Sequence, residues 1–162
     1  MDIRNSVFVV TGGGSGLGQA TVELIVAGGG KAVIADVNRA TGEALAAKLG
    51  DAVRFVECDV TSEEHGKRAV DTAVSAFGGL HGLVNCAGVG VPGKVLGKDG
   101  PLPLEKFAKI VGINLIGTFN MIRLAADAMM KGAPNAAGER GVIVNTASVA
   151  AFDGQIGQAA YS

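Results

Sequence analysis

The fold of this chain is decided by residues 7–18, whose sequence is VFVVTGGGSGLG. The run Val7–Val10 is apolar at every position, which is typical of a strand buried on both faces in a parallel sheet. It ends at Thr11 and a glycine cluster, and helical spacing of apolar residues begins at Leu17. The first backbone amides of a helix and its positive dipole end favour a phosphate group. The stretch therefore predicts a strand, a phosphate-binding turn and a helix.

Strand-like and helix-like segments alternate along the rest of the chain. We expect strands at residues 7–10, 32–35, 53–56, 83–84 and 142–144, and helices at 17–27, 41–49, 61–77 and 104–130. Segments 90–103 and 131–141 are rich in glycine, proline or polar residues and are expected to be loops. Repeated strand-helix units predict a parallel sheet with helices on both faces. We thus expect one domain over residues 1–162 with a doubly wound α/β fold of Rossmann type and about five strands.

Composition excludes several classes of protein. Charged residues make up 18% of the chain and the net charge is −1, which argues against both disorder and nucleic-acid binding. Cys58 and Cys86 are the two cysteines and do not form a short-spaced pair, so neither a disulfide framework nor a metal site is expected. The N-terminus lacks the pattern of a signal peptide, and no apolar stretch reaches about 18 residues. We expect a soluble, cytoplasmic protein that does not contact membranes.

An acidic residue follows the second predicted strand. Asp36 lies 18 residues after Gly18, where a carboxylate accepts hydrogen bonds from an adenosine ribose and repels a 2′-phosphate. This favours NAD over NADP. Arg39 is close enough in sequence to oppose that preference. The glycine spacing Gly12-x-x-x-Gly16-x-Gly18 differs from the common G-x-G-x-x-G fingerprint, and an ordinary flexible turn is the alternative interpretation. The strand, the helix and Asp36 together favour a dinucleotide site.

The motifs of the whole chain resemble those of the short-chain dehydrogenase/reductase family. The resemblance rests on Thr11 with the glycine loop, on Asn85-Cys86-Ala87-Gly88, and on Asn114, Ser148 and Tyr161. It extends from the first strand to the last residue. Within the family, residues 141–162 resemble the branch that acts on 3-hydroxyacyl-CoA.

This resemblance implies a set of functional residues. Ser148 would donate a hydrogen bond to the substrate oxygen, and Tyr161 would be the general acid/base. Asn114 would help to hold a water in a proton relay, and Gln155 would lie beside the substrate. The cofactor site would consist of Gly12, Ser15, Gly16, Leu17, Gly18, Asp36, Asp59, Val60, Asn85, Cys86, Ala87 and Gly88.

The implied reaction is hydride transfer between NAD and a secondary alcohol, most simply the 3-hydroxyl of an acyl-CoA. A free phenol has a pKa of about 10 and is a weak base at neutral pH. In the family, a lysine four residues after the tyrosine helps to correct this, and that position lies beyond Ser162. We therefore expect the chain to be the N-terminal part of a longer enzyme, to lack the last strands of the family fold, and to be inactive by itself.

Two alternative functions stay open at this point. One is an NADPH-dependent reductase of 3-oxoacyl-(acyl-carrier-protein) or acetoacetyl-CoA, against which Asp36 argues. The other is a non-catalytic NAD-binding or scaffold module. The resemblance also implies that the full-length form is a homotetramer and that its partner is an acyl-CoA or another small secondary alcohol.

Overall fold

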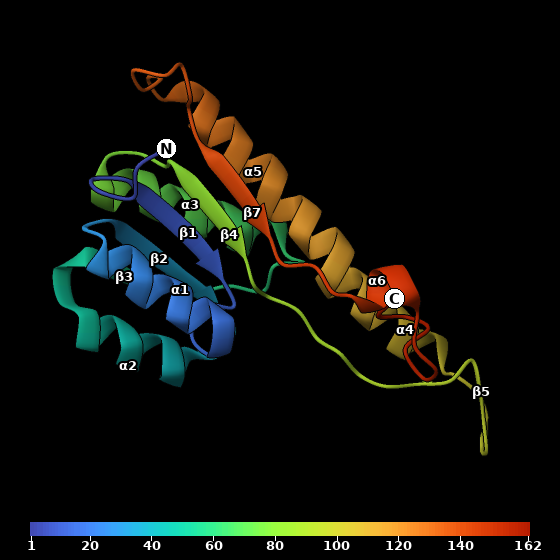
Figure 1. The fold of residues 1–162 in the computed structure, drawn as a ribbon. Helices are drawn as coiled ribbons and strands as arrows, with labels where there is room; N and C mark the ends of the chain where they lie inside the picture. The colour runs from blue at the N-terminus through green and yellow to red at the C-terminus, as the bar shows by residue number, and fades with distance from the viewer.

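A five-stranded parallel sheet forms the centre of the computed structural model, which describes residues 1–162. The strand order is β3-β2-β1-β4-β7, as the doubly wound prediction requires (Figure 1). The strands are β1 (Val7–Thr11), β2 (Lys31–Asp36), β3 (Val53–Glu57), β4 (Gly82–Asn85) and β7 (Val142–Asn145). All five predicted strands are confirmed, with bounds that differ by one or two residues.

Helices cover both faces of the sheet (Figure 1). Side chains of α1 and α2 share one core cluster with Phe8, Val10 and Ile34, whereas those of α3 and α5 share another with Val9 and Val33. This alternation along β1 and β2 explains why both strands are continuously apolar. The helices are α1 (Gly16–Ala27), α2 (Arg39–Leu49), α3 (Glu63–Phe77), α4 (Leu104–Val111), α5 (Thr118–Lys131) and α6 (Ala150–Asp153).

Local sequence determines where α2 begins and where α3 begins and ends. The Asn38 side chain accepts a hydrogen bond from the Thr41 amide at the start of α2, at 3.2 Å. The Ser62 hydroxyl accepts one from the His65 amide at the start of α3, at 3.3 Å. Gly78 ends α3 in the left-handed conformation, with φ of 86°. These are the cap residues that helix termini prefer.

The helix predicted over residues 104–130 is continuous, but it is not regular. A π-helical segment, Gly112–Gly117, separates α4 from α5. By length and composition, Leu104–Lys131 passes as a membrane-crossing helix, although no such stretch was expected from the sequence. Core helices of globular domains have the same composition, and Met121, Ala125 and Met129 are buried in the core beside α3 and the sheet. The helix is therefore weak support for a membrane span.

Two small elements were not predicted, one in the expected loop 90–103 and one in a stretch for which no element was expected. Segment 90–103 contains a hairpin of β5 (Leu96–Gly97) and β6 (Gly100–Pro101), and α6 follows β7. The strand β7 lies at the edge of the sheet, and Val142 and Val144 are 37% and 50% exposed. An exposed apolar edge of this kind is open to pairing with another strand.

Candidate cofactor and catalytic site

The glycine loop after β1 is shaped by close backbone packing. Gly12 has a φ of +63°, and a Cβ on it would lie 2.8 Å from the Ala87 amide nitrogen. A Cβ on Gly18 would lie 2.1 Å from the Gly12 carbonyl oxygen. Both positions therefore exclude any larger residue. Glycine at these positions lets the loop backbone pack directly against the first turn of α1.

The N-terminus of α1 is open to a ligand. Ser15 occupies the N-cap position, but its side chain makes no capping hydrogen bond. Gly16 has a φ of +51° and no heavy atom within 4 Å of the place where a Cβ would be. No acidic residue lies in the first turn. Since the first amides of a helix have no partner within the helix, these features fit the pyrophosphate of a dinucleotide.

Asp36 is held in place at the end of β2. It is 9% exposed, and each carboxylate oxygen accepts a hydrogen bond from a backbone amide. Gly14 donates to Oδ2 at 2.8 Å and Asn38 donates to Oδ1 at 2.9 Å. Each oxygen keeps further lone-pair capacity. The carboxylate is thus oriented before any ribose hydroxyl arrives.

These residues border one cleft with a volume of about 440 Å³. Every predicted cofactor residue except Asn85 lines it. Sequence reasoning missed Ala35, Val37, Cys58, Val89 and Ile113, which line it as well. Most of them are apolar residues next to predicted ones. Their side chains belong to no recognisable motif, so the sequence did not mark them as cofactor residues.

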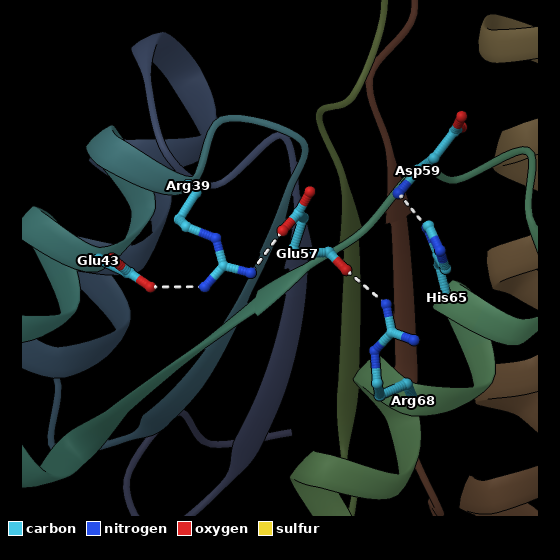
Figure 2. Close-up of polar contacts among 6 residues, drawn as sticks. All are labelled: Arg39, Glu43, Glu57, Asp59, His65 and Arg68. Atoms are coloured by element: carbon cyan, nitrogen blue, oxygen red, sulfur yellow. Dashed lines mark hydrogen bonds and ion pairs between the residues drawn. The ribbon is translucent and has the colours of Figure 1, made fainter.

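Asp59, one of the predicted cofactor residues, lines the cleft just after β3. Its amide donates to Nδ1 of His65 at 3.2 Å (Figure 2). Its carboxylate accepts hydrogen bonds from the hydroxyl and the amide of Thr61, at 2.7 Å and 2.9 Å. These bonds, the hydroxyl first, hold the pKa of the Asp59 carboxyl below its usual range. The charged carboxylate fixes the turn that follows β3.

A second cavity, of about 320 Å³, adjoins the cleft. It brings together Ser148, Tyr161 and Asn114 from three separate segments. The Asn114 amide oxygen accepts from the Val89 amide and its amide nitrogen donates to the Val89 carbonyl, both at 2.9 Å. The side chain of Asn114 thus fixes the chain after β4, while its predicted part in a proton relay stays a prediction.

Two predicted residues lie elsewhere than expected. Asn85 lines the second cavity instead of the cleft, and its side chain contacts Thr11 and Asn145. Gln155 is exposed in the turn after α6 and does not line the cavity with Tyr161. Its place beside the substrate stays a prediction. Sequence reasoning also missed Thr118 and Thr146, whose hydroxyl groups had no motif to mark them.

A third hollow, of about 620 Å³, is larger than the cleft and the second cavity. It lies between α3, α5 and the segment that includes Arg140, and it contains none of the predicted site residues. Its lining charges are mostly paired, as in the contacts of Lys67 with Asp71 and of Lys131 with Asp127. We therefore place the functional site in the cleft and the second cavity.

Comparison with known proteins agrees with this geometry. The profile of the short chain dehydrogenase family matches residues 6–162. The 3-hydroxyacyl-CoA dehydrogenase type-2 of Drosophila melanogaster is 51% identical over 162 residues, which cover 99% of this chain and 64% of that protein. The Homo sapiens protein of the same name is 49% identical, with 99% and 62% covered. The chain thus spans less than two thirds of the length of these relatives.

A solved structure shows the same fold. The crystal structure of 3-hydroxyacyl-CoA dehydrogenase type-2 from Mycobacterium avium superposes with a TM-score of 0.90 at 41% sequence identity. The superposition covers 96% of this chain and 61% of that one. With the family profile matched along nearly the whole sequence, the chain belongs to the short chain dehydrogenase family.

Proposed function

We propose that the protein is an NAD-dependent oxidoreductase that interconverts the 3-hydroxyl group of an acyl-CoA and the corresponding ketone. One observation carries the proposal. The cleft and the second cavity share Cys86, Ala87, Gly88 and Val89, so the glycine loop and the Ser148–Tyr161 pair border one continuous site. A dinucleotide bound in the cleft therefore reaches a substrate bound in the second cavity.

The chain's own residues have distinct tasks in this proposal. The amides at the start of α1 and Ser15 bind the pyrophosphate, and Asp36 binds the adenosine ribose. When bound, nicotinamide supplies the hydride chemistry. Ser148 orients the substrate oxygen, and Tyr161 transfers its proton. The substrate class comes from the named relatives, which are 3-hydroxyacyl-CoA dehydrogenases.

The test is NADH formation from a 3-hydroxyacyl-CoA and NAD, measured with the protein extended through the family's lysine. Tyr161→Phe and Ser148→Ala are each expected to lower kcat by about 100-fold or more. The first variant loses the group that transfers the proton, and the second loses the group that orients the substrate oxygen. Ser162→Ala, which removes an exposed hydroxyl beside Tyr161, is the matched control and keeps activity. We expect the 162-residue chain without that lysine to bind NAD but not to turn over.

Two results would contradict the proposal. Normal turnover by Tyr161→Phe would remove the acid/base role of the tyrosine. A preference of the wild-type protein for NADPH would favour the reductase alternative. Binding of ADP-ribose, followed by calorimetry, separates a loss of chemistry from a loss of the fold, since it depends on the cleft alone.

A further inference from the structure

Arg39 is the cation nearest in sequence to Asp36, and the structure shows what holds it. Its Nη1 donates to Oε1 of Glu43 at 2.9 Å, and its Nη2 donates to Oε2 of Glu57 at 2.6 Å (Figure 2). Both terminal nitrogens of the guanidinium are therefore engaged by carboxylates. An arginine uses the same two nitrogens when it binds a phosphate in a bidentate way.

The fold brings the two glutamates to Arg39 by different routes. Glu43 lies one helical turn further along α2, at the i,i+4 position. Glu57 is the last residue of β3 and is the register partner of Asp36 on β2. Neighbouring strands lie about 4.8 Å apart, so Glu57 and Asp36 end side by side. Arg39 is thus tied to the end of β3, beside the end of β2 where Asp36 lines the cleft.

A second arginine at this edge is also engaged. The Nη2 of Arg68 donates to the backbone carbonyl of Glu57 at 3.0 Å (Figure 2), and its Nη1 lies 3.6 Å from the Glu64 carboxylate. Asp36, Glu57 and Asp59 all lie at this end of the sheet, at or just after the ends of β2 and β3. The local charge therefore disfavours an added phosphate, although two arginines are close by.

We propose that Glu57 and Glu43 are specificity-determining residues, because they withhold the Arg39 guanidinium from the 2′-phosphate that distinguishes NADP from NAD. This inference rests on the proposed NAD-dependent function and refines it. Asp36 repels the 2′-phosphate, and the two glutamates bind the Arg39 side chain that would otherwise attract it. The preference for NAD is therefore shared among three carboxylates.

The test is a comparison of ADP-ribose with 2′-phospho-ADP-ribose binding by calorimetry, which needs no catalysis. The double variant Glu43→Gln/Glu57→Gln keeps the size of both side chains and removes their charges. We expect it to bind the phosphorylated ligand about tenfold more tightly than the wild type, with binding of ADP-ribose nearly unchanged. Adding Arg39→Ala to the double variant is expected to abolish the gain.

The controls separate this inference from a general charge effect. Lys67 and Asp71 form an exposed i,i+4 ion pair on α3 outside the cleft, so Asp71→Asn is the matched control and should leave the preference unchanged. An unchanged preference in the glutamate double variant would overturn the inference, as would a gain that survives Arg39→Ala. Failure of the wild type to bind ADP-ribose would instead overturn the proposed function.

Discussion

The Thr11 hydroxyl at the end of β1 lies 3.3 Å from the amide oxygen of Asn85 at the end of β4, to which it donates. The same oxygen of Thr11 accepts hydrogen bonds from the amides of Cys86 and Ala87, each at 3.2 Å. Asn85 continues the connection by donating to the Asn145 side chain at 2.9 Å. One buried hydroxyl thus joins the glycine loop to the strands that carry the second cavity.

Thr11→Val should destabilise the fold by about 1–3 kcal/mol, because it leaves buried polar groups without their partner. The measurement is urea denaturation. Thr11→Ser keeps the hydroxyl and is the control, with a loss that is expected to be smaller. Equal losses in the two variants would show that the methyl group matters more than the hydrogen bonds.

Gly18→Ala is expected to destabilise the protein by about 3 kcal/mol and to abolish binding of ADP-ribose, since the new Cβ collides with the Gly12 carbonyl. Gly112→Ala is the matched control, because no heavy atom lies within 4 Å of its new Cβ. That variant should gain about 0.5–1 kcal/mol from helix propensity. Thermal unfolding and calorimetry measure both effects. A stable, ligand-binding Gly18→Ala protein would refute the tight loop.

The two cysteines should differ in reactivity. Burial, the largest cause, raises the pKa of the Cys58 thiol to about 11, and Cys58 is 2% exposed. Cys86 is half-buried and lines both the cleft and the second cavity. At about pH 8, iodoacetamide should modify Cys86 first, and ADP-ribose should slow the reaction.

Intact mass measures the labelling, and Cys86→Ala should remove it. Faster labelling of Cys58 than of Cys86 in the folded protein would contradict the burial of Cys58. A rate that ADP-ribose does not change would count against a cofactor in the cleft.

The Asp59 carboxylate should contribute to stability in a pH-dependent way. Because its pKa is lowered in the folded state, its contribution is present above the unfolded carboxyl pKa of about 4 and is lost as the pH falls through the folded value. Thr61→Val removes the hydroxyl donor and should move the pKa of Asp59 back up. NMR titration of the Asp59 side chain measures the shift, and an unchanged pKa would contradict the assigned cause.

Features that depend on neighbouring residues could be predicted from the sequence, whereas contacts between distant segments could not. The strand, the glycine loop and the helix over residues 7–27 follow from neighbouring residues, and the structure has them where they were expected. The contact of Arg39 with Glu57 depends on the register of β2 against β3, which no local pattern specifies. The position of Gln155 was inferred from resemblance, and the turn after α6 leaves its side chain exposed.

The π-helical segment has a consequence for how the long helix tolerates insertions and deletions. Asn114 lies within it and holds Val89, whereas Met121 and Ala125 of the following helix are buried in the core. A residue advances an α-helix by about 100°, so deleting one residue between 112 and 117 would rotate the two halves out of phase. Either the Asn114 contact or the buried face of α5 would then be kept, but not both. The extra residue in the π turn thus sets the angular offset between the part of the helix that faces the second cavity and the part that supports the sheet.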